Sequence, residues 1–239
     1  AFQVQDSPIR IAFIMDEFER LLDTMPNYFF VALRSLRDRF KSRLMFVTFT
    51  RDNLQRLVEE QNRKTDLEPF IELFNDHTIY LGPFNDDDAW NMIENLERRS
   101  DQRNDYAIGL LIRATGGFAG LLRAGFRHVE KLENISSQDK QRVGHAATRL
   151  VAEMNVQAEC ETLLGNLNQR EIDTLYGVAQ RKTDLDARVL RELVAKSLLS
   201  ENTPGGVVKV IPPVLAAYIR NHPTPLAARP RVRPFTIPK

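Results

Sequence analysis

The sequence has 239 residues, with 43% hydrophobic residues, 27% charged residues and a formal net charge of +1. These values are ordinary for a folded globular protein with room for one large domain or two to three small ones. The near-neutral balance predicts neither nucleic acid nor a membrane as a partner of the whole chain, although it leaves a local basic face possible. The single cysteine, Cys160, excludes an intrachain disulfide and favours a reducing, cytoplasmic location. No apolar run reaches the roughly 18 residues that a membrane helix needs.

The first third of the chain has the pattern of a parallel α/β unit. Residues 9–15 form a continuous apolar run, which predicts a strand buried on both faces, and residues 43–49 form a second run. Between them, residues 27–41 place apolar side chains at helical spacing. Strand, helix and strand predict two parallel strands joined by a right-handed crossover. A helix at 52–62 and a short strand at 77–81 are expected to follow.

Helical patterns dominate the rest of the chain. After the break at Gly82-Pro83, Asn85 or Asp86 is expected to cap a helix. Further helices are predicted at 103–115, 117–133 and 138–160. Two more helices are expected to begin at caps near Asn168 and Asp184. The chain then continues with a turn at 203–206, a strand at 207–211 and a helix at 212–222, and this order is typical of a winged helix.

These patterns divide the sequence into four parts. They are an α/β core at 1–83, a helical lid at 84–160, a winged-helix domain at 161–222 and a tail or linker rich in proline and arginine at 223–239. The predicted fold class is a partial parallel α/β core followed by a helical domain and a winged-helix domain, mostly α overall.

Acidic and polar residues directly follow the two apolar runs. At the carboxyl end of a parallel strand, Asp16 could hold Mg²⁺ through its water shell, and Glu17 could polarise an attacking water. Thr50 and Arg51 follow the second strand and are expected at the same sheet edge, where a polar or cationic group could sense a γ-phosphate. The alternative for the Asp-Glu pair is an ordinary strand that leaves the core into water. For the pair taken alone, that alternative is the more frequent one.

Two further features carry possible chemistry in the helical part. Gly116 and Gly117 are expected at a helix start, where glycine lets the backbone approach a ligand closely, and a helix–helix turn is the alternative. The predicted winged helix carries four basic residues that could contact nucleic acid: Arg188, Arg191, Lys196 and Lys209. Three acidic residues oppose them: Asp184, Asp186 and Glu192. A face that reads DNA usually carries a clearer positive excess, so the opposing charges make DNA contact the less favoured role for this domain.

In this order, the motifs resemble the C-terminal two-thirds of a P-loop ATPase of the AAA+/STAND group. The matching segments are a Walker B strand at 11–17, a sensor at 50–51, a lid entry at 81–84, a lid motif at 116–119 and a winged helix at about 163–222. The resemblance implies ATP and Mg²⁺ as cofactors, with Asp16 organising the metal, Glu17 activating water and Arg51 reading the γ-phosphate. It also implies that four residues lie near the nucleotide: Thr50, Gly116, Gly117 and Ala119.

Two departures qualify this resemblance. Ala119 stands where the lid motif of the family has proline. The motif G-x-x-x-x-G-K-[ST] is absent, since none of the eleven glycines is followed by lysine. The resemblance therefore implies a fragment whose phosphate-binding segment lies upstream or on a separate chain, so that this chain alone is expected to be inactive.

The implied function is an ATP-dependent molecular switch in signal transduction. Nucleotide would lie between the sheet edge and the lid, and its state would set the position of the winged helix. The expected partners are ATP or ADP, with other protomers, protein partners or DNA as further possibilities, and no membrane. The alternatives are a DNA-binding module of an ATP-dependent loader or initiator, and a non-hydrolysing pseudo-ATPase interaction domain.

Overall fold

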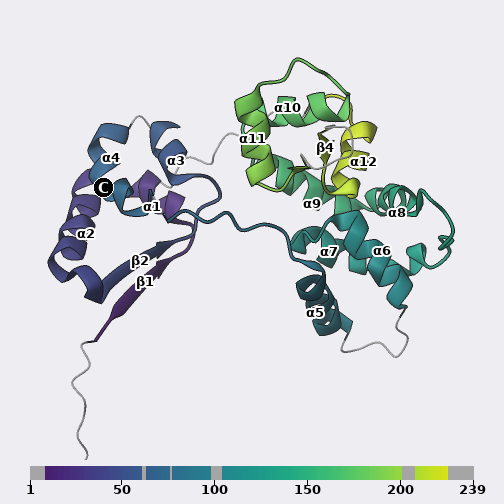
Figure 1. The fold of residues 1–239 in the computed structure, drawn as a ribbon, viewed down its shortest axis with the longest axis horizontal. Coiled ribbons are helices and arrows are strands. Elements are labelled where there is room, and N and C mark those ends of the chain that lie inside the picture. The colour runs from purple at the N-terminus through teal and green to yellow at the C-terminus, as the bar shows by residue number, and fades with distance from the viewer. Residues whose placement is uncertain (1–8, 61–62, 76, 98–103, 201–207, 226–239) are drawn as a thin grey trace, which may run out of the picture. The chain divides into compact units, whose positions relative to one another are not determined.

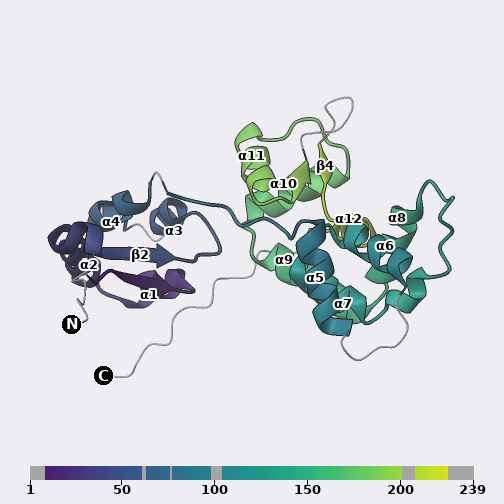
Figure 2. The same cartoon turned by 60° about the horizontal axis from the view of Figure 1, so that its bottom comes forward.

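The computed structural model describes residues 9–60, 63–75, 77–97, 104–200 and 208–225. These residues divide into two compact units, one ending at Ile79 and the other beginning at Tyr80. The first unit contains a parallel sheet, and the second is mostly helical (Figures 1 and 2). Within the described ranges, none of the helices has the length and apolar character to span a membrane.

The first unit is built around two parallel strands. In chain order its elements are β1 (Ile11–Met15), α1 (Phe18–Thr24), α2 (Asn27–Phe40), η1 (Lys41–Arg43), β2 (Leu44–Thr48), α3 (Leu54–Glu60), α4 (Lys64–Ile71) and η2 (Glu72–Phe74). β1 and β2 pair in a register that places Phe13 beside Phe46. The predicted parallel pair is thus confirmed, and α1 and α4 are helices that the sequence pattern did not predict.

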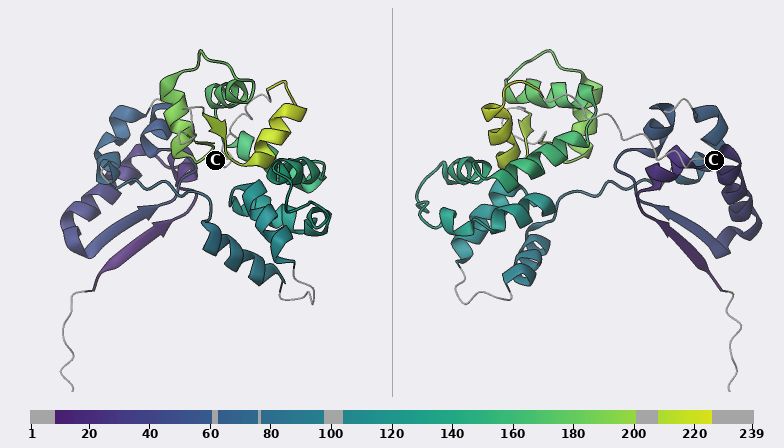
Figure 3. Two further views of the ribbon diagram at one scale, coloured as in Figure 1. Left: turned by 45° about the vertical axis from the view of Figure 1, so that its right-hand side comes forward. Right: turned by 180° about the vertical axis from the view of Figure 1, so that it is seen from behind.

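Helices α1 to α4 share an apolar core on one face of this sheet (Figures 1 and 3). Phe18 of α1, Phe30 of α2 and Phe70 of α4 lie at its centre and are buried. The rings of Phe18 and Phe70 stack with centroids 5.8 Å apart. Met15 and Phe46 pack against this core from the strands. The helical spacing of apolar residues in α2 therefore buries one face of that helix, as expected.

None of the described residues covers the opposite face of the sheet, which corrects the prediction of a strand buried on both faces. Side chains alternate along a strand, so Ile14 and Met45 point away from the helices, and they are 69% and 55% exposed. Ile11 and Phe13 lie on the helical side but at the outer edge of β1, and each is 51% exposed. β1 has the composition of a doubly covered strand, yet the described residues cover only one of its faces.

The strand predicted at 77–81 does not form, because these residues have no strand beside them within the described part of the chain. A β-strand is stable only in a ladder with neighbours. Ile79 and Leu81 are instead 82% and 79% exposed, in an irregular segment that joins the two units.

The second unit begins with α5 (Asp86–Glu97), and the side chain of Asn85 accepts the main-chain N–H of Asp88, so Asn85 is its cap. The following elements are α6 (Asp105–Thr115), α7 (Ala119–Phe126), η3 (Val129–Leu132), α8 (Arg142–Val151) and α9 (Met154–Gly165). The chain ends with α10 (Gln169–Ala179), α11 (Ala187–Ala195), β3 (Leu199–Ser200), β4 (Lys209–Val210) and α12 (Pro213–Asn221). The helix predicted at 138–160 is therefore two helices, and the cap predicted near Asp184 is Asp186.

A continuous hydrophobic core runs through this unit from α5 to α12. α12 packs against α6, α8 and α9, so the segment predicted as a lid and the segment predicted as a winged helix share this core. β3 and β4 form an antiparallel pair between α11 and α12. The turn predicted at 203–206 and the part of the tail from 226 onward lie outside the described residues.

Candidate functional site

The two strands of the first unit end side by side. Beyond the last paired residues, the main-chain N–H of Phe49 donates to the Met15 carbonyl oxygen at 2.9 Å, and the N–H of Phe18 donates to the Phe49 carbonyl oxygen at 3.0 Å. These two bonds extend the contact between the chain segments past the ladder. Segments 16–17 and 50–51 therefore lie together at the carboxyl edge, as the sequence predicts for parallel strands.

Glu17 and Arg51 meet at this edge. Arg51 Nη2 donates to Glu17 Oε1 at 3.2 Å, and the other oxygen of the carboxylate lies 2.8 Å from Arg20 Nε. The Glu17 side chain is 37% exposed and the Arg51 side chain is 62% exposed. An ion pair this open to water contributes about 0–1 kcal/mol, so an anionic ligand can compete for the guanidinium at little cost.

Glu19 is a third carboxylate at the same edge, which the Asp-Glu motif did not single out. Its Oε1 lies 3.5 Å from Arg51 Nε, and its side chain is 19% exposed. Its Oε2 is buried and has no hydrogen-bond partner among the described residues. An acidic residue in the first turn of the helix that follows the strand was the available signal.

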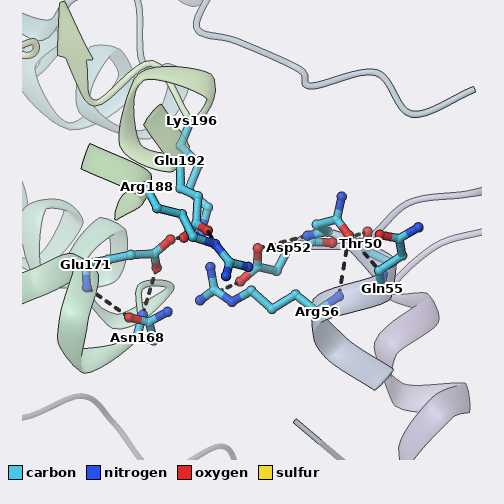
Figure 4. A network of polar contacts seen from close by, with 10 residues as sticks. Thr50, Asp52, Gln55, Arg56, Asn168, Glu171, Arg188, Glu192 and Lys196 are labelled. Atoms are coloured by element: carbon cyan, nitrogen blue, oxygen red, sulfur yellow. Dashed lines mark hydrogen bonds and ion pairs between the residues drawn. The ribbon is translucent and has the colours of Figure 1, made fainter. Parts of the chain in front are cut away.

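The remaining residues of this edge are engaged locally. Asp16 Oδ1 accepts the main-chain N–H of Glu17 at 2.9 Å, and Glu17 itself has φ 47° and ψ 45°, in the left-handed region. The Thr50 hydroxyl donates to the carbonyl oxygen of Asp52 at 2.7 Å, which fixes the turn after β2 (Figure 4). Within the described ranges, no three His, Cys, Asp or Glu side chains form a metal-binding group. Asp16 is exposed, and a single carboxylate with water ligands is a common protein contribution to a Mg²⁺ site.

The Gly116-Gly117 pair forms the turn between α6 and α7. Both residues have positive φ, 61° and 77°. A Cβ on Gly117 would lie 2.2 Å from the carbonyl oxygen of Phe84, and the Phe84 N–H donates to the Gly117 carbonyl oxygen at 3.0 Å. The pair therefore forms a helix–helix turn, which was the alternative interpretation. Phe84, in the segment that leads into α5, approaches this turn closely. Ala119 is the first residue of α7.

The four basic candidates of the winged-helix segment separate into two groups. Arg188, Arg191 and Lys209 are exposed, and Arg188 Nε lies 3.3 Å from Glu192 Oε1 in the next turn of α11. Lys196 instead points into the unit. Its Nζ lies 2.8 Å from Glu171 Oε1, and the two side chains are 15% and 0% exposed.

Glu171 also closes the N-terminus of α10 (Figure 4). Its Oε2 accepts the main-chain N–H of Asn168 at 2.9 Å, while Asn168 Oδ1 accepts the main-chain N–H of Glu171 at 2.9 Å. This reciprocal capping box confirms the predicted cap at Asn168. The same carboxylate therefore joins the start of α10 to the end of α11 through Lys196.

The single cysteine is structural. Cys160 is fully buried in the core of the second unit, and burial raises the pKa of its thiol to about 12, with Glu159 and Glu161 adding to the rise. A thiol with this pKa is almost wholly protonated at neutral pH and is a poor nucleophile.

Comparisons of this chain with protein-family models, with curated proteins and with solved structures found no match.

Proposed function

We propose that this chain is part of a nucleotide-dependent switch ATPase of the AAA+/STAND type. The observation that carries the proposal is the parallel pairing of β1 and β2, which brings the acidic segment 16–17 beside the polar and cationic segment 50–51. The carboxyl edge of a parallel sheet is where open α/β folds bind their ligands. An acid beside a cation at that edge suits a phosphate group and an attacking water.

In this proposal, the ion pair between Glu17 and Arg51 is the resting state of the site. A γ-phosphate, carrying more negative charge than one carboxylate, draws the Arg51 guanidinium away from Glu17. The released Glu17 carboxylate then orients the attacking water and accepts its proton. Glu19 stays on the α1 side of Arg51 and limits how far the guanidinium moves. Mg²⁺, bound with the nucleotide and through water to Asp16, would neutralise phosphate charge.

The proposal requires a phosphate-binding loop from outside these 239 residues, because the sequence contains no G-x-x-x-x-G-K-[ST] motif. Backbone N–H groups of such a loop supply most of the contacts to the β- and γ-phosphates. The 239-residue chain is therefore expected to bind Mg-ATP weakly. Tight binding of Mg-ATP by this chain alone, measured by calorimetry, would contradict the proposed division of the site.

Glu17→Gln in the full-length protein is the direct test. Glutamine keeps the size of the side chain but cannot accept a proton, so nucleotide binding is expected to persist while turnover falls roughly a hundredfold or more. The matched control is Glu72→Gln, which removes an exposed carboxylate in η2 at the edge of the same unit. Unchanged turnover in Glu17→Gln, with fluorescent-nucleotide binding intact, would refute the role of Glu17.

In the same proposal, the state of the bound nucleotide sets the position of the segment 161–222. If the full-length protein binds nucleotide but never turns it over, the pseudo-ATPase alternative is favoured.

DNA binding by the second unit is the other candidate function. It is supported by the exposure of Arg188 and Arg191 on α11 and of Lys209 on β4, which pairs antiparallel with β3. Phosphate contacts of this kind make affinity fall steeply with salt. Duplex binding should therefore weaken in the double variant Arg188→Glu, Arg191→Glu and show a shallower dependence on salt. A mobility shift that the double variant leaves unchanged would exclude α11 as the contact.

A further inference from the structure

In the described part of the chain, the outer edge of β1 is a free strand edge. Within the described residues, the parallel sheet has the order β1-β2, so β1 has a strand on one side only. Because the Met15 carbonyl oxygen accepts from Phe49, the main-chain groups of Met15 face β2. Main-chain groups alternate in direction along a strand, so those of Ala12 and Ile14 face outward.

This edge lacks the features that protect an edge strand from pairing. The segment 11–15, IAFIM, contains no proline, no lysine and no other charge, and it is regular over its whole length. Natural edge strands are usually short, charged, bulged or covered. Ile11 and Phe13 add two apolar side chains, each 51% exposed, at the same edge. A strand of this composition is expected to accept another strand.

Charge favours one orientation of that strand. Arg10 precedes β1 and Asp16 follows it, and both are exposed. A second β1 that runs antiparallel, with Phe13 opposite Phe13, places Arg10 of each copy opposite Asp16 of the other. A parallel second copy would place like charges side by side, which destabilises a strand pair.

We propose that two copies of this chain associate through β1, as antiparallel neighbours in a four-stranded sheet with the order β2-β1-β1-β2. In the register centred on Phe13, Ala12 of each copy lies opposite Ile14 of the other. Both residues have outward main-chain groups, so they form hydrogen-bonded pairs. The two Phe13 rings lie across the symmetry axis and cover each other together with Ile11. The symmetry is isologous and closes at two copies. This interface does not rest on the proposed nucleotide site, and it excludes any strand from outside these 239 residues that would pair with the same edge of β1.

Sedimentation equilibrium of the 239-residue chain over a range of concentrations tests the proposal. Matched proline variants are placed on the two outer edges of the sheet. Ala12→Pro removes an outward N–H of β1. Because the Phe49 main chain faces β1, Thr48→Pro removes an outward N–H of β2. A dimer is expected for the wild type and for Thr48→Pro. Ala12→Pro is expected to raise the dimer dissociation constant roughly thirtyfold, because two hydrogen bonds are lost by symmetry.

A charge exchange tests the register without altering the backbone. Arg10→Asp and Asp16→Arg should each raise the dissociation constant roughly fivefold, and the double variant should restore it. Because Asp16 also belongs to the proposed nucleotide site, the readout of this experiment is the sedimentation mass and not nucleotide turnover. Hydrogen exchange adds an independent measure, since the Ala12 and Ile14 amides should lose protection on dilution while the Met15 amide keeps it.

Three results would overturn the proposal. The first is a wild-type chain that stays monomeric at every concentration. The second is a dimer dissociation constant that is the same in Ala12→Pro as in Thr48→Pro. The third is concentration-independent protection of the Ala12 and Ile14 amides, which would mean that another segment of polypeptide occupies the edge.

Discussion

Replacing Glu171 with alanine is expected to destabilise the second unit by about 3–4 kcal/mol. Glu171 is 0% exposed; its Oε1 accepts from Lys196 Nζ and its Oε2 accepts from the main-chain N–H of Asn168. Removing one member of a buried ion pair costs about 3–5 kcal/mol, and the 15% exposure of Lys196 places this case at the lower end. Loss of the capping bond adds about 1 kcal/mol.

The assay is urea unfolding followed by fluorescence. The chain has a single tryptophan, Trp90, which lies in α5 and packs against the core of the second unit, so its emission reports that unit. Asp173→Asn is the matched control, because Asp173 lies two residues further along α10 but is exposed. A change within about 0.5 kcal/mol is expected for it.

A double-mutant cycle then separates the ion pair from the cap. Glu171→Gln retains an oxygen for the Asn168 N–H, and Lys196→Met removes the cation while keeping the apolar stem. Each single change should cost about 2–3 kcal/mol, and the pair together should cost less than the sum by at least about 1.5 kcal/mol. Additive costs, or a Glu171→Ala variant as stable as Asp173→Asn, would show that the buried pair does not stabilise the fold.

Three further predictions concern the second unit. Gly117→Ala should lower stability by at least about 2 kcal/mol in the same assay, because φ at Gly117 is 77° and the new Cβ would lie 2.2 Å from a carbonyl oxygen. Gly144 is the control: it lies inside α8 with open space at its Cβ among the described atoms, so Gly144→Ala should raise stability by about 0.5–1 kcal/mol. Cys160 should resist iodoacetamide at pH 8 until the chain is unfolded, since burial raises its pKa to about 12, and rapid labelling of the native protein would contradict this. Hydrogen bonding to Lys131 lowers the pKa of Glu153 in the folded chain. The ionised carboxylate therefore stabilises the folded state at pH values above its ordinary pKa, and this contribution is lost as the pH falls through the lowered pKa. Glu153→Gln should make stability less sensitive to acid, as measured by unfolding between pH 6 and pH 3.

Local sequence patterns predicted many of the individual elements. Helical spacing located α2 and α12, and cap residues located the starts of α5 and α10, because these signals depend on neighbours within one turn of chain. The parallel pairing of β1 with β2 was also correct. The residues 16–17 and 50–51 meet at one edge because that placement follows from the parallel topology alone.

Features that depend on distant contacts were not predictable. The composition of β1 indicates cover on both faces, but Ile14 is 69% exposed, since cover depends on which other segments are present. The segment 77–81 has the composition of a strand and lacks a ladder for the same reason. Lys196 resembled a surface contact in the sequence, and only the three-dimensional neighbourhood of Glu171 places it inside the unit. Glu19 was missed because the sequence pattern did not predict α1, the helix that carries it beside Arg51.

The left-handed backbone conformation of Glu17 determines which substitutions at this position raise the stability of the chain. A residue other than glycine in that conformation costs about 1 kcal/mol or more, and glycine would relieve it. Glutamate at position 17 therefore holds its carboxylate beside Arg51 at the expense of chain stability. Random mutagenesis selected only for thermal resistance should enrich Glu17→Gly, whereas selection that also demands the activity of this edge should retain the acid. The substitution pattern at one position would thus report whether this carboxylate is kept for folding or for chemistry.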